Sequence, residues 1–306
     1  MTAWTPPVRT LRDVLVDGER RLANAGVPSP RVDAELLLAH VLGVPRGRMF
    51  LSDPVDGAVA LRFEALLVKR AARVPVQHLV GEAPFRHLEL EVGRGVFVPR
   101  PETETVAELA IRALTSDAEE RLAVDLCTGS GAIALALATE VPHSVVHAVE
   151  LEEAAYEWAV RNLVRQEEAI AAVGSRVLLH RGDATRAHLE ALAPIVGRVD
   201  VVVTNPPYIP DNAVPRDPEV REYDPPRALF GGPDGLDVVR GIADSAAALL
   251  RPGGLLVVEH GDEQGERAGE LGVPFVLREH GGYVDVGDRP DLGGRDRVTL
   301  ARRARA

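Results

Sequence analysis

The chain has 306 residues, 46% of them apolar, and its single cysteine excludes an intramolecular disulfide and favours a reducing, cytoplasmic location. No run of about 18 apolar residues is present, so neither a membrane span nor a membrane partner is expected. Residues 1–73 carry 11 basic and 8 acidic side chains and the remainder carries 24 and 38, and so acidic a remainder argues against stable nucleic-acid binding, which neutralises phosphates.

The first 73 residues predict a small helical bundle. Apolar residues recur at helical spacing over 8–25. A serine cap followed by proline begins a second helix over 30–43. A third helix is predicted over 58–72. We therefore assign 1–73 to a helical substrate-recognition domain.

The segment after the bundle predicts a β-hairpin linker. Residues 76–98 alternate between apolar and polar side chains and carry glycines at the spacing of turns. The linker is assigned to 74–101, and a larger domain to 102–306.

The larger domain alternates predicted strands with predicted helices. The strands are 121–126, 144–150, 176–182, 199–204 and 254–260, and the helices are 102–115, 131–140, 152–166, 235–251 and 263–271. Strand-like stretches near 275–279, 283–286 and 297–302 close the sheet. Such alternation predicts an α/β fold with a doubly wound, mainly parallel sheet.

A tight turn follows the first of these strands. In DLCTGSG, Asp125 ends the strand and five residues lead into a helix: Cys127, Thr128, Gly129, Ser130 and Gly131. Glycines allow a ligand to approach the backbone, and a helix N-terminus offers free N–H groups to an anionic group. The glycine spacing differs from that of the dinucleotide fingerprint. Alone, the turn is a weak signal, since many α/β proteins have one for packing.

Two acids follow at the ends of the next strands. Glu150 lies about 20 residues beyond the turn, where a carboxylate can accept both ribose hydroxyls of a nucleoside cofactor. Asp183 ends the third strand, where an adenine amino group can donate. Either acid alone is more often a solvated side chain. Together with the glycine turn and the stretch NPPY (205–208), which follows the fourth strand, they indicate an S-adenosylmethionine-dependent methyltransferase.

The stretch VVVTNPPYIP runs from a buried strand into a rigid turn at Asn205, Pro206, Pro207 and Tyr208. Two prolines end the strand because they donate no N–H and fix φ. Open α/β sheets bind ligands at the carboxyl ends of their strands. These four residues by themselves fit a functional turn and a mere strand-ending turn about equally.

Taken with longer motifs, the chain resembles the bacterial release-factor glutamine methyltransferases of the HemK/PrmC family over nearly its whole length. The motifs are PVQHLVGEAPFRHLELEVGRGVFVPRPETE (75–104), DLCTGSGAIALALA (125–138), NPPYIP (205–210), LLVVEHGDEQG (255–265) and DRVTLARR (296–303). NPPY is shared with nucleic-acid amino-methyltransferases, so the stretch containing PRPETE discriminates between substrates.

The resemblance implies a site for S-adenosylmethionine and its product S-adenosylhomocysteine. Residues 127–131 would wrap the methionine part, Glu150 would hold the ribose, and Asp183 with Ala184 would lie beside the adenine, with Asn205 at the methyl end. Cys127 stands where the family usually has Gly, Glu150 where Asp is commoner, and Ala184 where an aromatic residue often flanks the adenine.

The resemblance also implies that Asn205 to Tyr208 hold a glutamine from the Gly-Gly-Gln loop of peptide-chain release factors. The Asn205 side-chain oxygen and the Pro206 carbonyl can each accept one amide N–H, which positions a weak nucleophile without a strong base. The prolines rigidify this turn. Tyr208 can pack on the amide plane or attract the sulfonium through its ring, and pure packing is its alternative.

Other functional groups carry less weight. No metal site is expected, because His143 and His147 are four apart on a predicted strand rather than on one helical face. Arg100, Glu102 and Glu104 of PRPETE fit helix initiation and linker attachment better than catalysis. Two alternatives to protein-glutamine methylation remain: methylation of an exocyclic amine in RNA or DNA, and a non-catalytic binding module with the same fold.

Overall fold

The computed structural model describes residues 10–52, 55–114, 121–291 and 293–305. They form two compact units. One comprises the chain up to Glu82 together with Arg216–Tyr223, and the other comprises Ala83–Pro215 and the chain from Asp224 onward. Residues 8, 9 and 115, at the ends of two predicted helices, lie outside the described residues.

The first unit is helical. Its elements are α1 (Leu11–Asn24), α2 (Pro30–Leu42), the 3-10 helix η1 (Arg46–Leu51), α3 (Gly57–Ala71), α4 (Val76–Val80) and α8 (Pro218–Tyr223). Thr10 and Asp13 form a capping box that begins α1. The three predicted helices are confirmed.

A buried ion pair ties a distant segment into this unit. Arg70 donates to Asp33 (2.7 Å) and to Glu219 of α8 (2.7 Å). Arg73 donates to both oxygens of Glu219 (2.7 and 2.6 Å). Burial raises the pKa of Glu219, but the two arginines outweigh it and lower the value to about 2. Helix α8, which the sequence did not predict, is therefore part of the helical unit.

The β-hairpin of the linker is shorter than the predicted 76–98. Strands β1 (Glu82–Phe85) and β2 (Leu88–Glu91) form a two-stranded sheet. The preceding residues, predicted as part of the hairpin, instead form the one-turn helix α4. This helix ends at Gly81 in the left-handed conformation (φ 81°), which glycine adopts without steric cost. Arg86 in the hairpin turn is held by Glu104, Glu108 and Glu140.

The second unit is built on a seven-stranded sheet with the order β5-β4-β3-β6-β7-β9-β8. Its strands are β3 (Arg121–Leu126), β4 (Ser144–Glu150), β5 (Arg176–Arg181), β6 (Val199–Thr204), β7 (Leu250–Glu259), β8 (Tyr283–Pro290) and β9 (Asp296–Arg303). The strands β3 to β7 pair in parallel, and β9 is antiparallel to both β7 and β8. The doubly wound α/β prediction is confirmed.

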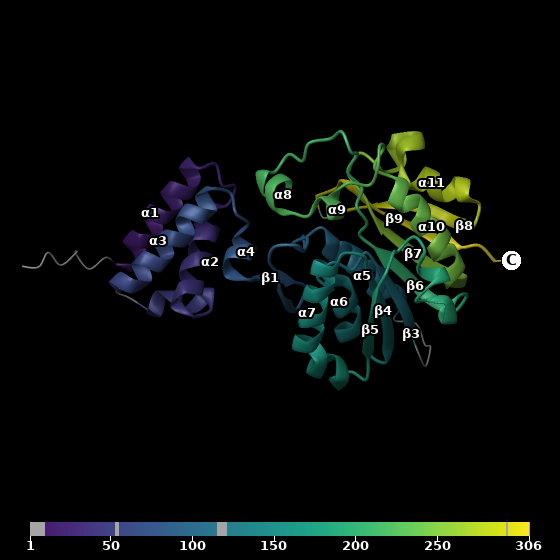
Figure 1. Ribbon diagram of the computed structural model, residues 1–306, viewed down its shortest axis with the longest axis horizontal. Helices are drawn as coiled ribbons and strands as arrows, with labels where there is room; N and C mark the ends of the chain where they lie inside the picture. The colour runs from purple at the N-terminus through teal and green to yellow at the C-terminus, as the bar shows by residue number, and fades with distance from the viewer. Residues whose placement is uncertain (1–9, 53–54, 115–120, 292, 306) are drawn as a thin grey trace, which may run out of the picture. The chain divides into compact units, whose positions relative to one another are not determined.

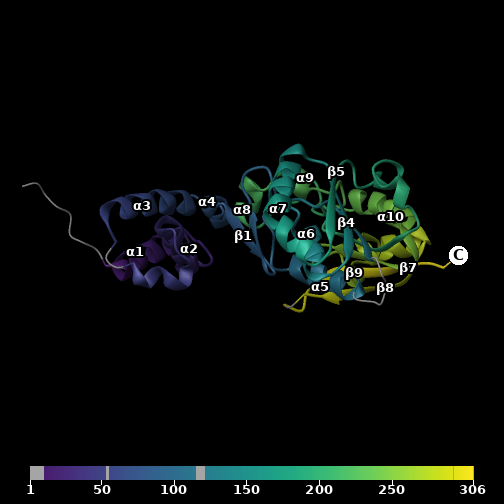
Figure 2. The same ribbon diagram turned by 90° about the horizontal axis from the view of Figure 1, so that it is seen from below.

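Helices cover both faces of this sheet (Figure 1, Figure 2). One apolar core lies between the sheet and α5 (Thr103–Leu114), α6 (Ala132–Glu140) and α7 (Glu153–Ala172). The other lies against α10 (Asp237–Leu249) and α11 (Val273–His280). Successive strand residues alternate between them, as Val202 and Val203 do.

Two predicted elements of the tail were wrong. Residues 275–279 were predicted as a strand but belong to α11, in which Val273 and Leu277 are buried four residues apart and a proline lies in the first turn. The short apolar run did not reveal its period. The helix predicted over 263–271 is reduced to the 3-10 helix η4 (Glu266–Leu271). Remaining short elements are η2 (Ala187–Leu189), η3 (Ala193–Ile195) and α9 (Pro226–Leu229).

The strand order places a switch point between β3 and β6. From β3 the chain continues outward through β4 and β5, and it then returns to place β6 on the other side of β3. Loops that follow strands on either side of such a point diverge and leave a crevice for a ligand. The Gly turn and NPPY follow these two neighbouring strands.

Candidate active site

The turn after β3 (Cys127–Gly131, hereafter the β3 turn) is held by Asp125. This carboxylate is fully buried and accepts from the Thr128 hydroxyl and from the Ala134 backbone N–H in α6 (3.1 Å). Burial raises the pKa of Asp125 to about 7, despite these two hydrogen bonds. Asp125 thus joins the strand, the turn and the helix that follows. The sequence pattern indicates only that Asp125 ends the strand.

The β3 turn needs left-handed backbone at three positions. Gly129 (φ 58°) and Gly131 (φ 87°) adopt it easily, whereas Cys127 (φ 64°) stands where glycine would be unstrained. A Cβ added at Gly129 would meet no described atom within 4 Å, so the turn borders open space. Burial raises the pKa of the Cys127 thiol, which disfavours the thiolate that a nucleophile would need.

Glu150 at the end of β4 lies against this turn. Its Oε2 accepts from the Gly129 backbone N–H (2.8 Å), and its Oε1 accepts from the Glu152 N–H (2.8 Å). Burial raises the pKa of Glu150, while these backbone donors lower it. A carboxylate offers about four lone-pair sites, so two bonds leave it able to accept from a further ligand.

The acid Asp183, which follows β5, is part of a local turn. Asp183 Oδ1 accepts from both the backbone N–H (2.9 Å) and the hydroxyl (2.7 Å) of Thr185. Gly182 donates its N–H to the Glu150 carbonyl (2.9 Å), so this loop adjoins the end of β4. The Ala184 side chain is buried in the core on the α10 side of the sheet.

The turn after β6 (Asn205–Tyr208, hereafter the β6 turn) lies beside the end of β3. The Thr204 hydroxyl donates to the Leu126 carbonyl (2.7 Å), which ties the two strand ends together. Asn205 is half-buried and donates from Nδ2 to the Thr103 hydroxyl (3.2 Å). Thr103 is the first residue of α5 and belongs to PRPETE. The structure thereby brings together the two turns that the sequence singled out.

The backbone of the β6 turn is clamped by two glycines and a glutamine. A Cβ on Gly231 would lie 2.5 Å from the Pro207 carbonyl oxygen, and one on Gly235 would lie 2.2 Å from that of Tyr208. Gln264 donates from Nε2 to the Tyr208 carbonyl (2.9 Å). The sequence pattern predicted no role for these three residues. The stretch FGGPDG was a usable signal, because paired glycines often mark close backbone approach.

The acid at the end of β7 was also missed. Glu259 is 2% exposed, and its Oε2 has no hydrogen-bond partner in the described part of the chain. Burial raises the pKa of Glu259 to about 7, although Thr103, Arg297 and Asn205 all act to lower it. Its signal in the sequence was an acid at the end of the apolar run LLVVE.

Two charged residues of PRPETE connect segments of the second unit. Glu104 accepts from the Arg86 backbone N–H in the hairpin (3.0 Å). Arg100 donates to the buried Asp224 (2.6 Å), where the chain returns to the second unit. These contacts agree with the predicted attachment role.

Comparison with known proteins decides the family. The "PrmC N-terminal domain" matches residues 13–81 and the "Methyltransferase small domain" matches 88–217. A release factor glutamine methyltransferase of Streptomyces coelicolor is 51% identical over 93% of this chain and 95% of its own length. One of Mycolicibacterium smegmatis is 49% identical over 97% and 99%. The chain belongs to the release factor glutamine methyltransferase family.

A solved structure from the same family is also similar. A release factor-specific protein-(glutamine-N5) methyltransferase of Alicyclobacillus acidocaldarius is 26% identical, with a TM-score of 0.40, and the match covers 70% of this chain and 99% of that one.

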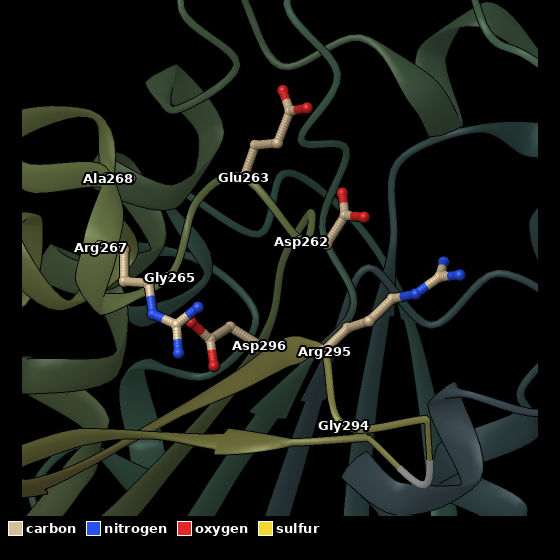
Figure 3. Close-up of a pocket in the computed structure, with 8 residues that line it drawn as sticks. All are labelled: Asp262, Glu263, Gly265, Arg267, Ala268, Gly294, Arg295 and Asp296. Atoms are coloured by element: carbon tan, nitrogen blue, oxygen red, sulfur yellow. The ribbon is translucent and has the colours of Figure 1, made fainter.

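In this release factor glutamine methyltransferase family member, a charged cavity of about 410 Å³ lies outside the predicted site (Figure 3). It is lined by Asp262, Glu263, Gly265, Arg267, Ala268, Gly294, Arg295 and Asp296. None of the residues predicted for the cofactor or the glutamine lines it. The loop after β7 that lines the cavity also carries Gln264, which contacts the β6 turn through the Tyr208 carbonyl.

The histidines singled out in the sequence do not gather with other ligands. His143 lies in a turn (φ 57°), and His147 stacks on His180 with ring centroids 5.1 Å apart. Among the residues that the structure describes, no group of three or more His, Cys, Asp or Glu side chains could hold a metal ion. No helix in that same part of the chain is long and apolar enough to cross a membrane.

Proposed function

We propose that this protein transfers a methyl group from S-adenosylmethionine to the side-chain amide nitrogen of the glutamine in the Gly-Gly-Gln loop of peptide-chain release factors. One observation carries the proposal: the β3 turn and the β6 turn meet at the switch point of the sheet, tied by the bond between Thr204 and Leu126. The identity of about half to relatives named for this activity supports it.

The residues around the β3 turn fit the cofactor. The open space at Gly129 admits a group close to the backbone, and the buried Glu150 carboxylate keeps acceptor capacity for ribose hydroxyls. By family resemblance Asp183 and Ala184 lie beside the adenine and Asn205 lies near the methyl end. When bound, the cofactor supplies a methyl group on a sulfonium centre. The roles proposed here for Glu150, Asp183 and Asn205 are hydrogen bonds and do not involve a metal.

The β6 turn fits a carboxamide substrate. An amide nitrogen is a poor nucleophile because its lone pair is delocalised into the carbonyl. The Asn205 side-chain oxygen and the Pro206 carbonyl would each accept one N–H, which favours a nitrogen with its lone pair directed at the methyl group. The prolines restrict the backbone that carries the Pro206 carbonyl, and Gly231 and Gly235 pack against the next two carbonyls, those of Pro207 and Tyr208.

Tyr208 completes the pocket for the amide. Burial raises the pKa of its phenol, so the ring stays neutral and does not act as a base. A neutral ring can pack on the amide plane and offer its negative face to the sulfonium.

The helical unit and the hairpin would recognise the folded release factor in the cytoplasm. The predicted acidic charge of the larger domain suits a basic protein partner more than a nucleic acid. Methylation of an exocyclic amine in RNA or DNA remains the alternative, because NPPY is shared with such enzymes.

Methyl-labelled cofactor tests the proposal. The protein is incubated separately with release factor, with release factor whose loop glutamine is replaced by alanine, and with total RNA. We expect label in the intact release factor alone. Label in RNA would support the alternative, and label in the alanine-substituted factor would exclude the loop glutamine as the acceptor.

A further inference from the structure

A carboxamide at position 205 has two ends of almost equal shape, and only one of them suits the proposed reaction. Oδ1 can accept an N–H from the substrate amide, whereas the Nδ2 group would present two donors to it. The orientation of Asn205 therefore decides whether the β6 turn functions. Nothing within Asn205 favours one orientation over the other.

Thr103 contacts the inner end of this amide but does not select it. Nδ2 of Asn205 lies 3.2 Å from the Thr103 hydroxyl, which is buried at the first turn of α5. A hydroxyl both donates and accepts. It could therefore accept from Nδ2 or donate to Oδ1 with equal ease. A third group must decide the direction of this hydrogen bond.

Glu259 is placed to decide it. The parallel register pairs Thr204 with Val258, so Asn205 and Glu259 leave adjacent strands side by side. The carboxyl is buried, and its Oε2 lacks a partner among the described residues. An ionised carboxylate can only accept. The Thr103 hydroxyl hydrogen-bonds to this carboxyl. It therefore donates its O–H to the carboxylate and leaves its lone pairs to accept from Nδ2. The reversed amide would turn Oδ1 toward a buried negative charge.

We propose that Glu259 is a positioning residue that acts through the Thr103 hydroxyl to hold the Asn205 carboxamide with Nδ2 inward and Oδ1 toward the substrate. It neither touches the substrate nor takes its proton. The assignment rests on the proposed methyl transfer and explains why a carboxyl is kept in a position that costs desolvation free energy.

The charged neighbours of Glu259 set the pH range in which it is ionised and can orient Asn205. Arg297 on β9 favours its ionised form, and Glu102 before α5 disfavours it. Tyr208 lies close enough for Glu259 to raise the pKa of its phenol, after the larger effect of burial. With burial, the pKa of Glu259 is about 7. Below that pH the carboxyl is protonated and can donate, so the preference for one amide orientation is lost and kcat falls as the pH drops through this value.

The first test replaces Glu259 by glutamine, which keeps the shape but adds a donor. Single-turnover rates with intact release factor should fall by about 10- to 100-fold, the scale of a misplaced catalytic contact. Affinity for S-adenosylhomocysteine and the melting temperature should stay close to wild type, and the loss of rate near pH 7 should disappear. A Glu259→Gln variant with the wild-type rate and pH profile would overturn the proposal.

Two further comparisons separate positioning from structural support. Thr103→Val should lower the rate as Glu259→Gln does, while Thr103→Ser, which restores the hydroxyl, should recover most of it. In a protein that already carries Asn205→Ala, the change Glu259→Gln should have no further effect, because its effect passes through Asn205. A further loss of the same size in that background would show an independent role and overturn the proposal. Inactive wild-type protein would instead refute the proposed function itself.

Discussion

The β3 turn and the β6 turn end neighbouring strands of one sheet, yet they are held in opposite ways. The β3 turn is held by hydrogen bonds to the carboxylates of Asp125 and Glu150, which lie at the ends of β3 and β4. It borders open space at Gly129. The β6 turn is held by close packing instead, because Gly231 and Gly235, in the segment before α10, lie against its Pro207 and Tyr208 carbonyls. A turn that must wrap a ligand keeps open space beside its backbone. A turn that must aim two acceptors at one atom is clamped.

The largest expected effect removes an acceptor from the clamped turn. Asn205→Ala should lower kcat by about two to three orders of magnitude, the loss typical of one preorganised contact. The matched control is Asn212→Ala, which makes the same change at an exposed asparagine in the following loop. Single-turnover rates and melting temperatures measure both. Equal rates for Asn205→Ala and wild type would reduce NPPY to a strand-ending turn.

The clamp itself is tested by adding one methyl group. Gly235→Ala places a Cβ 2.2 Å from the Tyr208 carbonyl, so the β6 turn must shift, and we expect a loss of about 100-fold in kcat. Gly197→Ala is the control, because it has a similar φ (72° against 79°) but meets no described atom within 4 Å. Both variants lose stability through backbone strain. If both also lost activity equally, the clamp would have no catalytic role.

The open turn is tested by ligand affinity rather than by rate. Glu150→Ala should weaken binding of S-adenosylhomocysteine by about 1–3 kcal/mol, the scale for hydrogen bonds to a charged acceptor. Glu157→Ala, an exposed acid on α7, should leave affinity unchanged. Isothermal titration calorimetry distinguishes them. Unchanged affinity in Glu150→Ala would remove this carboxylate from the cofactor site.

The smallest expected effect concerns Cys127. Its left-handed φ of 64° strains a side chain that glycine lacks, so Cys127→Gly should relieve about 1 kcal/mol of strain in the folded state. Cys127→Ala keeps the Cβ and should give no such relief. Denaturant unfolding of the two variants measures the difference. A Gly variant less stable than the Ala variant would mean that the β3 turn relies on the side chain it carries.

Much of this arrangement could be predicted from the sequence because local patterns encode it. Alternating strands and helices gave the sheet, and motifs at strand ends gave the two turns. The clamp and the role of Glu259 could not be predicted, because they depend on contacts between segments far apart in the chain. Gly235 meets Tyr208, and Glu259 meets Asn205, only once the order of the strands is known.

The tail shows a different limit. The run PFVL is short and apolar, and its first residues fit a strand as well as a helix. Packing of Val273 and Leu277 against the sheet decides in favour of α11. In the same way α8 lacks a strong helical pattern, and the ion pairs of Glu219 with Arg70 and Arg73 place it in the helical unit.

The central claim is that the β6 turn presents a carboxamide nitrogen to the cofactor bound at the β3 turn. Its most direct test is a single-turnover reaction with intact release factor, followed by tandem mass spectrometry to locate the methyl group. We predict one methyl group, on the side-chain nitrogen of the Gly-Gly-Gln glutamine. A methyl group on another residue, or none from protein that binds the cofactor, would contradict the account.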